Sequence, residues 1–145
     1  MATGRDNRER VGQEIAVLMS GLVRGFRAGF VACADRFELG PSEAQLLWLL
    51  EESGDASTGE LARRLGVDPA NASTLLTKLE GRGLVRRQAA ERDRRRRLVS
   101  LTAAGRRTKL ALAGCMEARQ PGFAQLTTPE LISFRDLLRR VAGED

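Results

Sequence analysis

The residues best placed to do chemistry in this chain are arginines, and they are concentrated in one short segment. Between Arg82 and Arg97 there are eight arginines and two acids, Glu91 and Asp93. The remainder holds 16 of the 24 basic residues and 17 of the 19 acidic residues, so it is nearly neutral. Because a focused basic patch attracts polyanions, this segment indicates a surface for a phosphate-rich partner. The alternative is a solvated loop whose arginines only keep it soluble.

Other kinds of chemistry find little support in the sequence. The chain has no histidine, which removes the commonest general base and the usual activator of a serine nucleophile. Glu51, Glu52 and Asp55 cluster at the end of a predicted helix, but no base, metal-ligand set or glycine-rich phosphate loop accompanies them. We therefore predict that the protein is not an enzyme, with no catalytic residue, no metal and no cofactor.

The two cysteines, Cys33 and Cys115, are far apart in sequence. We interpret them as neither a disulfide framework nor a zinc site. Cys33 falls on the apolar stripe of a predicted helix, where a free cysteine behaves as a small hydrophobic side chain. The sequence leaves open whether Cys33 or Cys115 is redox-active.

Length and hydropathy indicate one domain in an aqueous compartment. The chain has 145 residues, of which 42% are hydrophobic, enough for a core. No uninterrupted apolar run approaches the ~18 residues of a membrane span. The first ten residues, "MATGRDNRER", lack the apolar stretch of a secretory signal. The sequence thus predicts a cytoplasmic protein with no membrane partner.

The elements around the arginine segment can be predicted from apolar periodicity and from helix-capping residues. We expect a long helix over 11–37 and a second from Pro41 to about Gly54. Two short helices follow, between Ser57 and Gly66 and between Asp68 and Gly83. The stretches 84–88 and 96–102 then predict a two-stranded antiparallel hairpin with arginines at its tip.

The ends of the chain are predicted to be helical as well. Thr102 caps a fifth helix that ends before Pro121, and residues 128–130 open a sixth. The first and last helices carry apolar stripes that could be buried against a second copy. Gly21, Gly25 and Gly29 share one face of the first helix, which favours close approach of another helix. The fold class is therefore mainly α, with a small β-wing.

Two short helices joined by the tight connection "GVD" have the helix lengths and the short turn of a helix-turn-helix. With the hairpin after them, the segment resembles the multiple-antibiotic-resistance-regulator (MarR) family of winged helix-turn-helix transcription regulators. The motif residues are Leu79, Glu80, Gly83, Leu84 and Val85 before the first strand, then Asp93, Arg95, Leu101, Thr102 and Gly105 around the second. The match spans about residues 39–105.

The resemblance implies a single MarR-like domain over residues 1–145. Its DNA-binding lobe would cover about 39–105, and its dimerisation helices about 6–37 and 106–143. The protein would be a homodimer that binds a pseudo-palindromic operator in double-stranded DNA. It would act as a transcription regulator, and a repressor released by a small-molecule effector is the form we expect.

The resemblance also assigns the DNA-contacting residues. The fourth helix would enter the major groove and the wing the adjacent minor groove, where a planar, permanently charged guanidinium fits well. Asp93 would orient Arg95 for the minor groove, and the other wing arginines would contact phosphates. Ser57 and Thr58 would bind a phosphate at the start of the third helix. Many relatives carry an arginine where Thr74 stands, so that base contact is not transferred. The expected recognition-helix residues are Pro69, Ala70, Asn71, Ser73, Thr74, Thr77 and Lys78, and the expected wing residues are Arg86, Arg87, Arg92, Asp93, Arg94, Arg95, Arg96 and Arg97.

An effector pocket is implied between the dimerisation helices and the DNA-binding lobe. It would draw on Arg24, Phe26, Arg27, Phe30 and Trp48. The alternative is that these aromatic residues belong to the core, because aromatic residues are only 4% of the chain and tyrosine is absent.

Two further functions stay open at the level of sequence. The arginine-rich wing could serve a nonspecific or architectural nucleic-acid-binding protein, although a dedicated helix-turn-helix argues against this. The wing could also meet an acidic protein, which would make the chain a partner-binding winged helix.

Overall fold

The computed structural model describes residues 4–51, 55–89, 97–120 and 122–144. Its elements are α1 (Gly4–Arg36), α2 (Pro41–Leu49), β1 (Ala56–Ser57), α3 (Thr58–Leu65), α4 (Pro69–Gly81), β2 (Val85–Ala89), β3 (Arg97–Leu101), α5 (Ala103–Ala118), the 3-10 helix η1 (Phe123–Gln125) and α6 (Thr128–Ala142). The predicted class, mainly α with a small wing, is confirmed.

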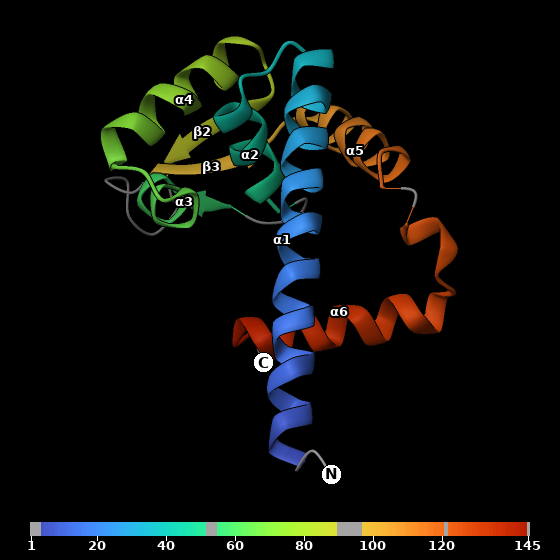
Figure 1. Cartoon of the computed structure of the whole chain (residues 1–145). Helices are drawn as coiled ribbons and strands as arrows, with labels where there is room; N and C mark the ends of the chain where they lie inside the picture. The colour runs from blue at the N-terminus through green and yellow to red at the C-terminus, as the bar shows by residue number, and fades with distance from the viewer. Residues whose placement is uncertain (1–3, 52–54, 90–96, 121, 145) are drawn as a thin grey trace.

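The described residues form a lobe mounted on one end of a long helix (Figure 1). Helices α2, α3 and α4 pack with the small sheet on one side of the upper half of α1, and α5 lies on its other side. Helix α6 crosses the lower half of α1, away from the lobe. The core therefore sits in the lobe and against the last turns of α1, where Cys33, Ala34 and Leu39 are buried with Leu46, Leu47, Leu61, Leu76 and Leu112.

Capping residues set the ends of the helices, as the sequence predicts. The Asp68 carboxylate accepts the Asn71 N–H at 2.9 Å, and the Ser57 hydroxyl accepts the Glu60 N–H at 3.2 Å. The Thr102 hydroxyl accepts the Gly105 N–H at 3.0 Å. Such caps satisfy donors that have no partner inside the first turn of a helix.

The sheet has one strand more than the sequence predicts. Its order is β1-β3-β2 and all pairs are antiparallel, with Ala56 opposite Val99 and Val85 opposite Leu101. The hairpin is confirmed, but β1 is only two residues long and carries no alternating pattern of its own. It exists because the chain leading into α3 passes the free edge of β3.

Two helix boundaries also differ from the expectation, and the first is the start of α1, which lies at Gly4 rather than at residue 11. Helix α2 ends at Leu49 rather than near Gly54, a residue outside the described part of the chain. Helix α6 begins at Thr128, as predicted, and Thr127 is its cap. Of the three glycines on α1, a Cβ atom at Gly29 would touch Arg119, at 3.7 Å, whereas Gly21 and Gly25 have nothing within 4 Å in the protomer.

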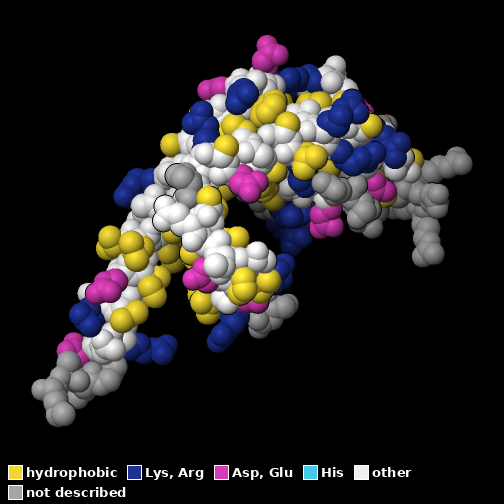
Figure 2. All heavy atoms as spheres, turned by 90° about the vertical axis from the view of Figure 1, so that its right-hand side faces the viewer, with side chains coloured by type: hydrophobic (Ala, Val, Ile, Leu, Met, Phe, Trp, Pro, Cys, Tyr) yellow, Lys and Arg dark blue, Asp and Glu magenta, His cyan; other side chains and the backbone are white. Residues whose placement is uncertain are grey.

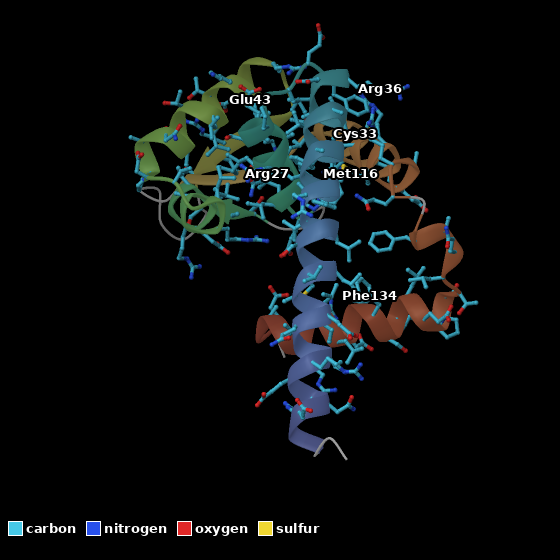
Figure 3. All side chains as sticks on the ribbon, in the orientation of Figure 1. Arg27, Cys33, Arg36, Glu43, Met116 and Phe134 are labelled. Carbon is cyan, nitrogen blue, oxygen red and sulfur yellow. A yellow bond between two sulfur atoms is a disulfide. The ribbon has the colours of Figure 1, made fainter. Side chains whose placement is uncertain are left out.

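The interpretation of Cys33 and Cys115 as unpaired cysteines is wrong. They form a disulfide that joins α1 to α5, with 6.0 Å between their Cα atoms. The two residues are 82 positions apart, and only the packing of α5 across the end of α1 brings them together. Figure 3 shows Cys33 at this crossing, beside Met116 of α5. A sensing mechanism that starts from a free thiol therefore does not apply to this form of the protein.

Candidate nucleic-acid interface

Helix α4 presents a continuous polar surface to solvent, opposite its buried leucines. Its buried side consists of Ala72, Leu75, Leu76 and Leu79. The first turn, Pro69 to Asn71, is exposed, and Thr74, Thr77 and Lys78 are exposed further along. This is the helix that the sequence assigns to recognition, and the structure leaves its amino-terminal half open for contact with a ligand.

Several polar groups on α4 have partners within the chain. The Thr74 hydroxyl donates to the Ala70 carbonyl oxygen at 3.1 Å. Lys78 Nζ lies 3.7 Å from Glu43 Oε1, so Glu43 holds this lysine beside α2. The Asn71 backbone N–H is used by the Asp68 cap, while its side chain is exposed.

The start of α3 offers less to a ligand than the sequence suggests. The Ser57 hydroxyl is the cap of α3 and accepts the Glu60 N–H. Ser57 and Thr58 are both half-buried, because Ser57 also pairs with Leu98 in the sheet.

Of the two wing arginines whose side chains the structure describes, one is exposed and one turns inward. Arg86 is exposed, and its Nε donates to the Ser100 hydroxyl at 3.1 Å. Arg87 instead points toward α4, where its Nη2 donates to the Ser73 carbonyl oxygen at 2.8 Å and to the Thr77 hydroxyl at 2.9 Å. A role in binding phosphate, expected for both arginines, therefore suits the position of Arg86 better. The predicted residues Arg92, Asp93, Arg94, Arg95 and Arg96 lie outside the described residues, as does the side chain of Arg97.

The lobe is tied to α1 by an arginine that the sequence analysis did not single out. The Arg82 guanidinium donates to the carbonyl oxygens of Phe37 and Glu38, at the end of α1. Glu38 has a positive φ of 55°, in a turn that closes with the Leu39 N–H donating to the Ala34 carbonyl oxygen. Because Arg82 follows α4 directly, these hydrogen bonds connect the end of α4 to the end of α1. The sequence shows this arginine only as part of a charged run.

The predicted effector residues divide between core and surface. Phe30 packs edge-on against Trp48, with 6.1 Å between the ring centroids, and both adjoin the buried core. Arg24, Arg27 and Phe26 are exposed on α1. Phe26 lines an apolar cavity of about 560 Å³ together with residues of α1 and α6, among them Leu22, Phe134 and Leu138. Figure 3 shows Phe134 on α6, far along α1 from Arg27.

Two apolar faces lie open in the protomer, one on α1 and one on α6. On α1, Leu18 is 67% exposed and Val23 62%, and on α6 Val141 is 76% exposed. No residue of α6 is buried. Figure 2 shows hydrophobic side chains along the free limb of α1 and on α6. Contiguous exposed apolar surface of this kind marks an interaction site.

Helix α1 is long and apolar enough to cross a membrane, by length and composition alone. Within Asp6–Arg36 it contains an 18-residue window with a mean hydropathy of 1.5, of which 6% is buried in the protomer. The expectation of no membrane segment rested on uninterrupted apolar runs. Helix-spaced apolar residues give this mean hydropathy without such a run.

Comparison with known proteins gives a consistent result. The model of the MarR family matches residues 39–96. The HTH-type transcriptional repressor Rv2887 of Mycobacterium tuberculosis is 35% identical over 99 residues, which cover 68% of this chain and 71% of that protein. The structure of CouR from Rhodococcus jostii RHA1, bound to p-coumaroyl-CoA, is similar with a TM-score of 0.71 and 25% identity, covering 90% of this chain and 93% of that one. An S. aureus MepR mutant bound to an oligodeoxyribonucleotide shares the fold, with a TM-score of 0.63, 18% identity and coverage of 89% and 96%.

Proposed function

Since the chain belongs to the MarR family of winged helix-turn-helix transcription regulators, we propose that it works as a dimeric repressor that binds a two-fold symmetric operator and leaves it when a small molecule binds. The observation that carries this proposal is the exposed polar face of α4 beside the wing. Regulators of this family are not enzymes, and the described residues hold no group of three or more metal-binding side chains.

The proposed dimer buries the apolar faces of α1 and α6 against those of a second copy. A buried leucine or valine contributes about 1.5–3 kcal/mol relative to an exposed one, so two such faces supply a strong drive for association. A bilayer is the competing partner for α1. We favour a second copy because Arg24 and Arg27 interrupt the apolar window, and because α6 carries an apolar stripe that a spanning α1 would leave exposed.

In the proposed complex, the amino-terminal half of α4 enters the major groove of each half-site. Asn71 is suited to adenine, because its amide can donate and accept at the same base edge. Pro69, Ala70, Thr74 and Lys78 would lie along the same groove, and Ser57 and Thr58 near a phosphate. The other two expected residues of α4 face Arg87 instead, through the Ser73 carbonyl oxygen and the Thr77 hydroxyl. The wing tip, with Arg95 oriented by Asp93, would reach the minor groove, while Arg86, Arg92, Arg94, Arg96 and Arg97 contact phosphates.

The proposed effector site lies where α1 meets the lobe, near Arg24, Phe26, Arg27, Phe30 and Trp48. Support comes from the similar CouR, which was solved with an aromatic acyl thioester. In this chain Phe30 and Trp48 are partly committed to the core, so Phe26 and the two arginines are the side chains free to meet a ligand. A bound molecule would change the distance between the two α4 helices of the dimer, so that it no longer matches the ~34 Å repeat of B-DNA.

A nonspecific nucleic-acid-binding protein is the second candidate, and the concentration of arginines in the wing favours it. Such a protein would bind random duplex about as well as any chosen site. A specific regulator binds its operator about 10³–10⁷ times more tightly than random DNA.

Selection of bound sequences from a random duplex library tests both candidates. The proposal predicts enrichment of a two-fold symmetric site whose half-sites lie about one helical turn apart. Binding of every duplex without enrichment would favour the nonspecific candidate. With the selected site, a gel-shift titration should show a severe loss of affinity for Arg95→Ala and a modest loss for Thr74→Ala.

A further inference from the structure

We propose that Arg87 is a positioning residue that locks the wing to the recognition helix, so that both elements approach DNA as one rigid unit. The inference rests on the proposed binding mode, in which α4 and the wing occupy neighbouring grooves. It assigns Arg87 a different role from the other wing arginines: Arg87 sets the distance and angle between the two reading elements.

The Arg87 side chain faces α4. Its Nη2 donates to the Ser73 carbonyl oxygen at 2.8 Å and to the Thr77 hydroxyl at 2.9 Å, and its backbone N–H donates to Glu80 Oε1 at 3.2 Å. Its Nε lies 3.7 Å from Glu80 Oε2, as an ion pair. The Arg87 side chain is only 17% exposed, so little of the guanidinium is available to a phosphate.

The partners of Arg87 form one row on α4. Ser73, Thr77 and Glu80 are spaced by four and three residues, which places them on the same face of the helix. The Thr77 hydroxyl completes the row by donating to the Ser73 carbonyl oxygen at 2.9 Å while it accepts from Arg87. Asn71, Thr74 and Lys78 lie on a different row, which the brace leaves open for DNA.

Strand geometry explains why neighbouring arginines differ. Successive side chains of a strand point to opposite faces, so Arg86 and Arg87 cannot point the same way. Arg86 bonds to Ser100 and stays exposed, whereas Arg87 faces α4. The brace favours arginine, because its planar guanidinium places Nη2 between the Ser73 carbonyl and the Thr77 hydroxyl while Nε stays beside the Glu80 carboxylate, whereas a lysine ammonium is a single point charge.

The salt dependence of DNA binding separates a brace from a phosphate contact. Each phosphate that a protein neutralises contributes about −0.9 to the slope of log K against log [salt]. Loss of a phosphate contact therefore lowers both affinity and slope. Loss of a brace lowers affinity for the specific site, because the two elements no longer meet both grooves together, and leaves the slope unchanged.

The experiment measures affinity for the selected operator by fluorescence anisotropy at several salt concentrations, for the full-length parent and for Arg87→Lys, Arg87→Ala and Arg86→Ala. We expect Arg87→Lys and Arg87→Ala to lose about tenfold or more in affinity, since hydrogen bonds to charged groups are of that strength. Their slopes should equal that of the parent. Arg86→Ala, the matched control on the same strand, should reduce the slope by about 0.9.

A double-mutant cycle with Thr77→Val keeps the test decisive if Arg87→Ala folds poorly. Thr77→Val removes the shared hydroxyl without changing charge, and circular dichroism checks the fold of each variant. A brace predicts that Arg87→Lys with Thr77→Val loses no more affinity than the weaker-binding single variant. Parent-like binding by Arg87→Lys, a slope reduced by Arg87→Ala, or additive losses in the cycle would each overturn the brace. Failure of the parent to bind any duplex would instead overturn the proposed function.

Discussion

Gly105, in the first turn of α5, packs directly against the backbone of Leu84, just before the first strand of the wing. A Cβ atom at position 105 would overlap the Leu84 carbonyl oxygen and lie 2.9 Å from the Leu84 carbonyl carbon. The Thr102 hydroxyl lies 2.6 Å from the Gly83 carbonyl oxygen, and the Thr102 N–H donates to the Leu84 carbonyl oxygen at 3.1 Å. Residues 101–105, "LTAAG", therefore fix the end of β3 against the turn that precedes β2. We call this contact the lock.

This lock predicts that Gly105→Ala destabilises the protein by about 1–3 kcal/mol, as overpacking against a fixed backbone does. Gly114→Ala is the matched control, because it lies on the same helix with nothing within 4 Å of the added carbon. It should instead stabilise the helix by roughly 0.5–1 kcal/mol. Urea unfolding of both variants measures the difference, and equal stabilities would contradict the close approach of Leu84.

The Cys33–Cys115 disulfide should contribute to stability by restricting the unfolded chain. For cysteines 82 residues apart, the chain-entropy model gives about 4.5 kcal/mol. Treatment with a dithiol reductant should therefore lower the unfolding midpoint of the parent. A variant with both cysteines changed to alanine should not respond to the reductant. Two titratable thiols in the denatured, unreduced protein would contradict the disulfide.

Charges placed on the exposed apolar faces should prevent the proposed dimer from forming. Leu18→Glu and Val141→Glu both alter residues that line the groove between α1 and α6. Burial of an unpaired carboxylate costs several kcal/mol, so we expect monomers in sedimentation experiments and a large loss of operator affinity. Gln45→Glu is the control, because Gln45 is exposed on α2, outside the two dimerisation segments, and does not line the groove. A monomeric parent would contradict the dimer.

The cap of α6 should weaken in acid. The pKa of Glu130 lies below its ordinary value because the Thr127 backbone N–H, and then the Thr127 hydroxyl, donate to its carboxylate. A lowered pKa in the folded protein stabilises α6 above the unfolded pKa of about 4.3, and this contribution is lost as the pH falls through the folded pKa. The stability difference between the parent and Glu130→Gln should therefore be present at pH 6 and shrink toward pH 3. A difference that does not change with pH would contradict the shift.

Much of this fold could be predicted from the sequence, because the signals that decide helices and hairpins act over a few residues. The side chains of Asp68 and Thr102 each accept a backbone N–H three residues further along the chain, and so cap α4 and α5. After α4, Gly83 adopts a positive φ of 69°, which ends that helix. The arginine run, the tight "GVD" connection and the "LTAAG" motif identified the wing and the helix-turn-helix. These signals involve residues that are close in sequence, so their positions along the chain also decide which of them lie close together in the fold.

The remaining features depend on residues that only packing brings together. Cys33 meets Cys115, Ala56 joins the edge of β3, and Arg82 reaches the carbonyl oxygen of Glu38, 44 residues away. The direction of Arg87 belongs to this group too. Its charge predicted a contact with a phosphate, whereas the packing of β2 against α4 places its guanidinium on the Thr77 hydroxyl. The amino-acid sequence alone determined which elements form and where the positive charge lies; the tertiary structure decided which side chains those elements hold fixed, because that depends on how helices and strands pack across long stretches of chain.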